Sequence, residues 1–153
     1  MIGRGMVMSG FSIAQGLLSP CEFVASPNFG ERPDPNDIHL IVIHNISLPP
    51  AQFGGGYIEQ FFQNQLDSSI HPYFEEIKDL QVSAHILITR LGERIQFVSF
   101  DDRAWHAGRS CYQGVENCND FSIGIELEGT DDQPFTEAQY QALTPVIQAI
   151  QHA

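Results

Sequence analysis

Apolar residues predict the first strand of a sheet at residues 37–45. They occupy both faces of an extended chain, with Ile38, Leu40 and Val42 on one face and Ile41 and Ile43 on the other. Apolar residues on both faces are typical of a strand that is covered on both sides. We therefore predict a strand in the middle of an α/β sheet.

Three further strands are predicted along the chain. Residues 82–90 and 94–100 flank a tight turn at Leu91-Gly92-Glu93, so these two strands should form a hairpin. The segment 120–128 is a strand with one apolar face and one face of small and acidic residues. The apolar face carries Phe121, Ile123, Ile125 and Leu127, and the other carries Ser122, Gly124, Glu126 and Glu128.

Helical spacing of apolar residues predicts helices at 57–66 and from Glu137 onward. Thr136 and Gln139 predict a capping box for the second helix. Pro145 falls inside it, so we expect a kink and a non-helical Thr144. No Gly or Asn cap precedes Ala153, which leads us to expect a chain truncated within this helix.

Strands and helices alternate without internal repeats, which predicts one α/β domain, a mixed central β-sheet flanked by helices. Residues 19–37 are rich in Pro, Asn and Asp, and we expect residues 1–23 to be an irregular N-terminal lead-in to a domain at 24–153.

The composition excludes some partners. The chain has 153 residues and a formal charge of -12, from 19 acidic and 7 basic residues. We expect neither nucleic acid nor a membrane as partner, because both need clustered Lys or Arg. No apolar run reaches the roughly 18 residues of a membrane span.

The first residues and the cysteines bear on the compartment of the protein. The apolar start up to Pro20 is too interrupted for a good signal peptide, and Pro20 before Cys21 spoils a lipoprotein cleavage site. Cys111 and Cys118 are close enough in sequence to pair. Reduced thiols in the cytoplasm are the favoured interpretation, and pairing stays open.

Two residues are candidates for chemistry. His44 ends an apolar strand and opens a Pro-rich loop, so it faces a cleft as a metal ligand or is an isolated edge histidine. Glu126 has only the small residues Ser122 and Gly124 before it on its face of the strand, so we expect open space above the sheet beside its carboxyl group. Glu126 is either a desolvated general base with a raised pKa or one carboxylate on a solvated face.

Other ring side chains are less specific. His85 lies within a predicted strand and is either a hydrogen-bonded core histidine, the favoured interpretation, or a ligand. Trp105, beside His106 in a loop, is either a platform for sugar or peptide or a packing residue. Phosphate-binding Gly-rich loops, Cys-x-x-Cys, His-Glu-x-x-His and Gly-x-Ser-x-Gly motifs do not occur in the sequence.

Four segments resemble the zinc-dependent N-acetylmuramyl-L-alanine amidases that act on 1,6-anhydro-muropeptides. They are residues 44–50 (HNISLPP), 82–85 (VSAH), 103–108 (RAWHAG) and 118–131 (CNDFSIGIELEGTD). The resemblance runs from about residue 24 to the last residue. It implies the fold shared with peptidoglycan recognition proteins and phage-type zinc amidases.

The resemblance also implies roles for particular residues. His44 matches a zinc ligand and Glu126 matches the catalytic carboxylate, which takes a proton from the attacking water while Zn²⁺ acts as Lewis acid. Asn45, Trp105 and His106 match positions along the substrate groove. The family's other two zinc ligands, a His and an Asp, and its catalytic Lys have no counterpart in residues 24–153, so we expect an amidase domain without its C-terminal metal-ligand segment and an inactive chain.

The predicted function is therefore a cytoplasmic, monomeric hydrolase of peptidoglycan recycling. It would cleave the amide between 1,6-anhydro-N-acetylmuramic acid and L-alanine, with an anhydro-muropeptide as substrate. The alternative is a module that binds peptidoglycan fragments without cutting them, or a truncated pseudo-enzyme.

Overall fold

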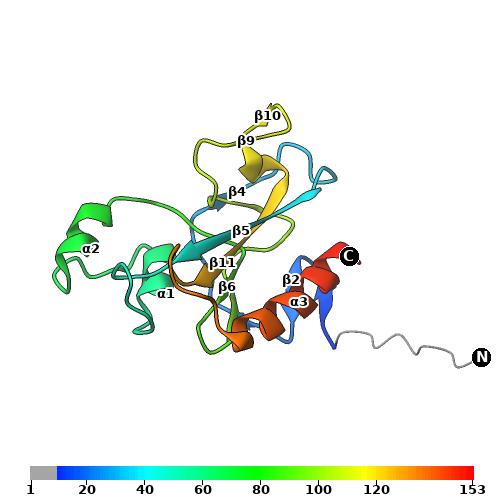
Figure 1. Cartoon of the computed structure of the whole chain (residues 1–153). Helices are drawn as coiled ribbons and strands as arrows, with labels where there is room; N and C mark the ends of the chain where they lie inside the picture. Colours follow the sequence, from blue (N-terminus) through cyan, green and yellow to red (C-terminus); the bar gives the residue numbers. More distant parts are fainter. Residues whose placement is uncertain (1–9) are drawn as a thin grey trace, which may run out of the picture.

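A five-stranded mixed sheet forms the centre of the computed structural model, which describes residues 10–153 (Figure 1). Across the sheet the strands are β3 (Glu22–Phe23), β7 (Arg94–Gln96), β6 (Ile86–Ile88), β11 (Ser122–Glu128) and β5 (Leu40–Ile46). Strand β11 pairs in parallel with both β5 and β6, β6 and β7 are antiparallel, and β3 and β7 are parallel. The predicted α/β class with a mixed central sheet is confirmed.

Strand β11 is buried along its whole length of seven residues. The prediction that residues 37–45 form a middle strand is wrong for the described residues. Strand β5 pairs with β11 on one side only, and Ile43 is 41% exposed. The apolar residues of a strand do not reveal how many neighbouring strands it pairs with. Conversely, β11 is buried on both faces although one of them carries two glutamates.

The predicted hairpin is confirmed as the antiparallel pair β6 and β7, with Leu87 opposite Ile95. Its first strand is shorter than predicted. The backbone N–H of Ser83 donates to the carbonyl of Trp105 and not to a strand of the central sheet, so the strand begins after this residue. Strand β8 (Arg103–Ala104), just before Trp105, pairs in turn with β4 (Phe29–Gly30).

Three helices flank the sheet: α1 (Tyr57–Phe62), α2 (Pro72–Ile77) and α3 (Glu137–Gln151). Helix α1 ends earlier than predicted, and Asn64 beyond it has a φ of 59°. Helix α2 was not predicted. Its start combines Pro72 in the first turn with an N-cap, His71, whose ring accepts a hydrogen bond from the backbone of Tyr73.

Helix α3 has the predicted capping box between Thr136 and Gln139. It continues through Pro145, so the expectation of a non-helical Thr144 is wrong. The hydroxyl of Thr144 donates to the carbonyl of Tyr140, as is common for Thr in a helix. The free energy gained by burying Ala142 and Val146 against the sheet exceeds the cost of the backbone hydrogen bond that Pro145 cannot make.

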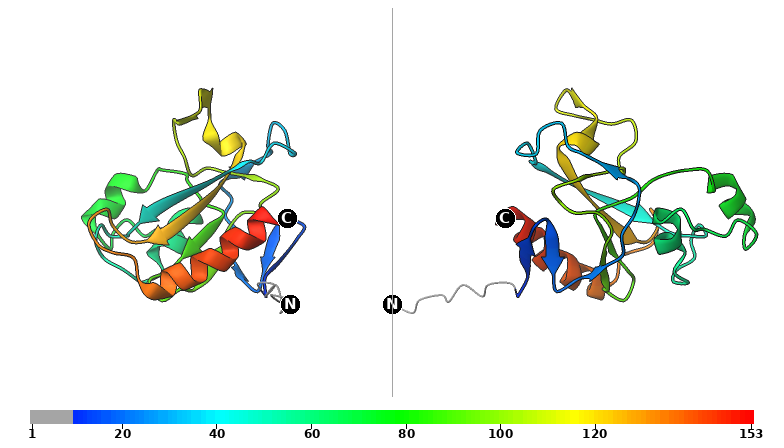
Figure 2. Two further views of the ribbon diagram at one scale, coloured as in Figure 1. Left: turned by 45° about the vertical axis from the view of Figure 1, so that its right-hand side comes forward. Right: turned by 180° about the vertical axis from the view of Figure 1, so that it is seen from behind.

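The two faces of the sheet carry separate apolar clusters. One includes Leu87, Ile95 and Phe97 with residues of α1 and α2, and the other includes Ile86, Ile88, Ile125 and Leu127 with residues of α3. Figure 2 shows α3 lying along its face of the sheet, with strands β1 and β2 beside it. The first face is also the face of Glu126, because side chains alternate along β11.

The N-terminal segment departs from the predicted irregular lead-in. Residues 12–19 form an antiparallel hairpin of β1 (Ser12–Ala14) and β2 (Leu17–Ser19), and β3 then enters the central sheet. The buried Gln96 holds the hairpin: its Oε1 accepts from the Leu18 N–H, and its Nε2 donates to the carbonyl of Gly16. Residues 1–9 of the lead-in and of the signal-like segment lie outside the described residues.

Two smaller elements complete the chain. Strands β9 (Cys111–Tyr112) and β10 (Val115–Glu116) form an antiparallel pair, and a short 3₁₀ helix, η1 (Cys118–Asp120), leads into β11. Cys21, Cys111 and Cys118 are free thiols, with Cys111 exposed and Cys118 buried.

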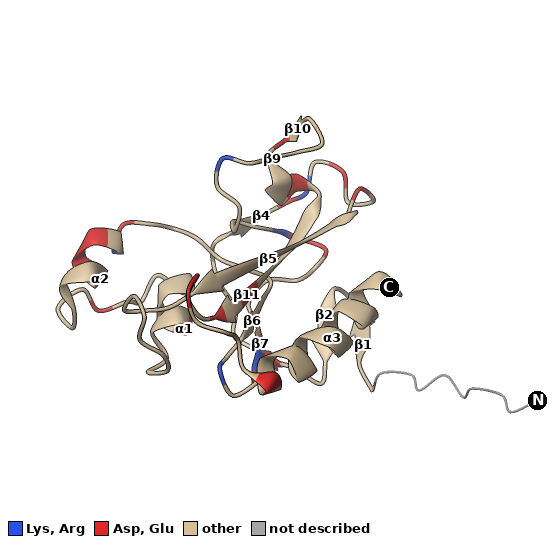
Figure 3. Ribbon diagram, viewed as in Figure 1, with Lys and Arg blue, Asp and Glu red and all other residues tan. Residues whose placement is uncertain are grey.

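Acidic positions are distributed over α2, the loop after β11 and the start of α3, and basic positions are few and separate (Figure 3). Within residues 10–153, none of the helices combines the length and hydrophobicity needed to cross a bilayer.

The N-terminal hairpin should contribute to stability through Leu18. Leu18 is 4% exposed and its neighbour Leu17 is 39% exposed. We expect Leu18→Ala to lower the free energy of unfolding by about 2–5 kcal/mol, and Leu17→Ala to change it by less than about 1 kcal/mol. Urea unfolding of the two variants measures this, and equal effects would mean that the hairpin does not belong to the core.

Candidate active site

His44 of β5 and Glu126 of β11 lie side by side on the sheet. The two residues are direct partners in the parallel register, and residues paired in this way direct their side chains to the same face. On the other side of Glu126 the register partner is Leu87 of β6, which is buried. The carboxyl group therefore lies between an imidazole and an aliphatic side chain.

Glu126 is buried without polar compensation. The residue is 8% exposed, and its Oε2 is buried and has no hydrogen-bond partner. Burial raises the pKa of Glu126 to about 8, because the charged form loses its hydration and gains no donor in return. Of the two interpretations left open by the sequence, the solvated face is excluded and the desolvated carboxyl is confirmed.

The space before Glu126 on the strand is not open, as its small residues had suggested. The ring of His106 packs directly over Gly124, where a Cβ would lie 2.3 Å from the His106 Cγ. Gly124 therefore allows a side chain from the loop after β8 to lie on the sheet beside His44. Small residues on one face of a strand can mark a place where another side chain packs closely on the sheet, and they can equally mark a cavity.

His44 and His106 are joined by a hydrogen bond of 2.9 Å between His44 Nε2 and His106 Nδ1. The pKa of His44 is lowered by burial. Burial, with the neighbouring His85 and His44, lowers the pKa of His106 to about 3. Both rings are therefore neutral at pH 7.

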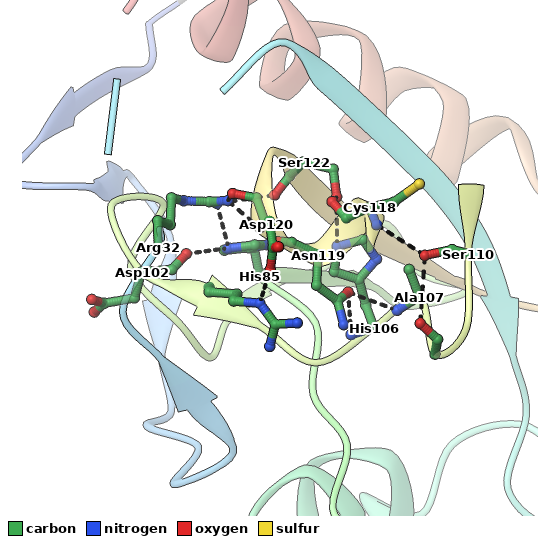
Figure 4. A network of polar contacts seen from close by, with 12 residues as sticks. Arg32, His85, Asp102, His106, Ala107, Ser110, Cys118, Asn119, Asp120 and Ser122 are labelled. Atoms are coloured by element: carbon green, nitrogen blue, oxygen red, sulfur yellow. Dashed lines mark hydrogen bonds and ion pairs between the residues drawn. The ribbon is translucent and has the colours of Figure 1, made fainter. Parts of the chain in front are cut away.

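Figure 4 shows the polar network that surrounds His106. Asn119 Oδ1 accepts from the backbone N–H groups of both His106 and Ala107. The hydroxyl of Ser122, on β11, lies 3.0 Å from His106 Nε2. The loop that carries His106 is thus fixed by the segment that leads into β11.

A second, deeper part of the network has a structural role. His85 is fully buried; its Nδ1 accepts from the Gly124 N–H and its Nε2 lies 3.0 Å from the carbonyl oxygen of Asp102. Arg32 donates to the carbonyl groups of Phe100, Asn119, Asp120 and Ser122. The prediction that His85 is a hydrogen-bonded core histidine is confirmed, whereas no sequence signal pointed to Arg32.

Asn45 and Trp105 are not brought into contact with this pair. Asn45 is exposed on the opposite face of β5 from His44, and its side-chain amide donates to Asp131 Oδ1 at 2.7 Å. Trp105 is half-buried; its backbone N–H donates to the Ser83 hydroxyl, and its carbonyl accepts from the Ser83 N–H. The substrate roles of Asn45, Trp105 and His106 remain predictions.

The structure does not assemble a metal centre from the residues that it describes. In the range 10–153, no three His, Cys, Asp or Glu side chains are arranged to hold a metal ion. A catalytic zinc uses three protein ligands and one open position, and this face of the sheet offers His44 beside a carboxyl that is protonated at neutral pH. The donor set described here does not by itself fit Zn²⁺.

Comparison with known proteins gives the family. The N-acetylmuramoyl-L-alanine amidase family matches residues 34–153. The chain belongs to this amidase family. The resemblance found in the sequence motifs is therefore confirmed.

Individual relatives of this amidase carry a more specific name. The 1,6-anhydro-N-acetylmuramyl-L-alanine amidase AmpD of Haemophilus influenzae is 62% identical over 138 residues, which are 88% of this chain and 75% of the relative. AmpD of Escherichia coli is 55% identical over 138 residues, with coverages of 90% and 75%. A crystal structure of a selenomethionine AmpD derivative superposes with a TM-score of 0.89 at 54% identity, covering 92% of this chain and 78% of the other.

The burial of Glu126 should make the stability of the amidase depend on pH. The pKa of this group is raised from 4.5 in the unfolded chain to about 8 in the folded one. Between these values the folded state holds a proton that the unfolded state has lost. The contribution of Glu126 to the free energy of unfolding is therefore undiminished below the lower pKa, falls as the pH rises, and levels off above the higher pKa.

We expect Glu126→Gln to unfold with nearly the wild-type free energy at about pH 4.5, and to be more stable than the wild type at about pH 8.5, by a few kcal/mol. Urea unfolding at the two pH values measures the difference. The exposed Glu116→Gln on β10 is the control and should show no such pH dependence. A difference between wild type and Glu126→Gln that does not change with pH would mean that the carboxyl is solvated.

Proposed function

We propose that the protein hydrolyses the amide bond between 1,6-anhydro-N-acetylmuramic acid and the L-alanine of the stem peptide. The proposal is supported by membership of the amidase family and by relatives more than half identical that carry this activity in their names. The observation that carries it is the carboxyl of Glu126, desolvated and in register with His44.

Glu126 would act as general base and then as general acid. In its ionised form it removes a proton from the attacking water, and it returns that proton to the departing amine. A pKa of about 8 suits both steps near neutral pH, since neither the loss nor the gain of a proton is strongly uphill. The buried side chain of Leu87, the register partner of Glu126 on β6, would help to maintain this pKa by excluding water.

We also propose Zn²⁺ as cofactor and His44 as one of its ligands, which rests on the resemblance of residues 44–50 to the zinc amidases. Because the described residues do not provide three ligands, no step is assigned to the metal. The neutral state of His44 is compatible with ligation, since a protonated imidazole cannot bind a cation.

The substrate would lie across the ends of β5 and β11. The exposed amide of Asn45 and the half-buried ring of Trp105 are proposed to contact it. A more distant relative, the amidase AmiD of E. coli, has a structure described as a complex with anhydro-N-acetylmuramic acid-L-Ala-D-gamma-Glu-L-Lys. That complex covers 94% of this chain at 26% identity with a TM-score of 0.51, which supports an anhydro-muropeptide as the substrate class. A cytoplasmic location and a monomeric state complete the proposal.

The protein should release a free stem peptide from an anhydro-muropeptide. We expect Glu126→Gln to reduce kcat by about 10²–10⁴-fold with little change in KM, because the amide keeps the shape but cannot accept a proton. Liquid chromatography of the released peptide measures the rate.

The matched control is Glu116→Gln, which makes the same exchange at an exposed position and should retain full activity. A Glu126→Gln variant with full turnover would remove this residue from the mechanism. Tight binding of the muropeptide by calorimetry, with no release of peptide by the wild type, would instead support the alternative of a binding module.

The metal proposal has a separate test. Treatment of the protein with a chelator should abolish peptide release, and Zn²⁺ should restore it while Mg²⁺ should not, because a nitrogen ligand favours zinc. Elemental analysis of the purified protein measures the metal content directly. Full activity after complete removal of metal would contradict the assignment of zinc.

A further inference from the structure

The hydroxyl of Ser122 fixes the direction of the hydrogen bonds that reach His44. Ser122 Oγ lies 2.5 Å from the carbonyl oxygen of Cys118, which can only accept. The single hydroxyl hydrogen is therefore donated to Cys118. Toward the other contact, His106 Nε2 at 3.0 Å, Ser122 must act as acceptor (Figure 4).

The proton positions in His106 follow from this. Its Nε2 carries a hydrogen, which it donates to Ser122 Oγ. A neutral imidazole has one protonated nitrogen, so its Nδ1 is an acceptor. Among residues 10–153 the ring bonds to His44 and Ser122, and no carboxylate forms an ion pair with it that would hold a second proton on the ring.

The same reasoning then fixes His44. Its Nε2 lies 2.9 Å from His106 Nδ1, which accepts, so the hydrogen of this bond belongs to His44 Nε2. The Nδ1 of His44 is left with the free lone pair. Three hydrogen bonds in series thus run from His44 to the Cys118 carbonyl, all in one direction.

We propose that His106 and Ser122 are positioning residues that hold His44 in the Nε2–H tautomer, so that Nδ1 is the nitrogen through which His44 acts. Buried hydrogen bonds in which the other ring nitrogen of a functional histidine is held by a fixed partner set its tautomer and orientation. The use of Nδ1 in catalysis rests on the proposed function, whereas the tautomer itself does not.

The surroundings of His106 support its role as a positioning residue for His44. His106 fits over β11 only because residue 124 is glycine, and its backbone N–H is held by Asn119. The ring contacts His44 on one side and Ser122 on the other.

Nuclear magnetic resonance of the protein with isotopically labelled histidine tests the proposal. We expect a nitrogen–nitrogen coupling across the hydrogen bond between His44 and His106. The one-bond nitrogen–hydrogen coupling should place the bridging hydrogen on His44 Nε2. A bridging hydrogen on His106 Nδ1, or the absence of any coupling between the two rings, would overturn the proposal.

The variant Ser122→Ala tests whether the Ser122 hydroxyl sets the direction of the hydrogen bonds between His44 and His106. Without the acceptor at Nε2, His106 is free to protonate either nitrogen, and we expect the fixed position of the bridging hydrogen to be lost. Ser110→Ala is the matched control, because Ser110 accepts from the Cys118 N–H in the same network but does not contact His106. In Ser110→Ala the bridging hydrogen should remain on His44 Nε2. If both variants lost the fixed position of this hydrogen, a specific role for Ser122 would be contradicted.

His85 reports whether a variant is correctly folded. Its Nδ1 accepts from the backbone of Gly124, and this bond does not involve the Ser122 hydroxyl. We expect unchanged nitrogen signals of His85 in both variants. If His106→Ala, with His85 unchanged, still shows the hydrogen of His44 Nε2 protected from exchange with solvent, His106 is not its partner and the proposal fails.

Discussion

The desolvation of one carboxyl group is the constraint on which the site depends. Glu126 lies on a fully buried strand of the sheet, with Leu87 on one side and His44 on the other, and no donor reaches its Oε2. An ionised carboxylate in such a position is unfavourable, so the group keeps its proton to about pH 8. In the proposed mechanism, a group that exchanges a proton near neutral pH serves amide hydrolysis.

The rest of the structure maintains that environment. Helices α1 and α2 and their apolar cluster cover the face of the sheet that carries Glu126, and α3 with the N-terminal hairpin covers the other. The loop after β8 adds His106, whose ring packs over Gly124, two residues before Glu126 on the same face of β11. Arg32 donates to the Asn119 carbonyl, and the Asn119 side chain accepts from the His106 N–H, so these two residues fix the ends of that loop. This polar network thereby supports the apolar environment of Glu126.

Much of the fold could be predicted from the sequence, because its elements follow local patterns. The capping box of α3, the hairpin of β6 and β7 and the apolar face of β11 all depend on residues close together in the chain. The place of β5 at an edge depends on pairing, which no local pattern encodes. The hairpin at residues 12–19 depends on Gln96, which is far away in sequence, and was missed for that reason.

The site was predictable to a similar degree. His44 and Glu126 stood out by residue type and by the motifs that contain them, and the register of β5 and β11 places them together. The contact between His106 and His44 was not predictable, since it requires a loop to fold back over one glycine. Gly124 was the available signal, but its small size had been interpreted as open space.

The central claim is that burial, and not a partner group, sets the chemistry of Glu126. A titration of its side-chain carboxyl by carbon nuclear magnetic resonance measures this most directly. The expected result is a pKa of about 8 that falls when Leu87→Ser admits water to the site. A pKa close to 4.5, the ordinary value for glutamic acid, would show that the carboxyl is hydrated and would contradict the mechanism.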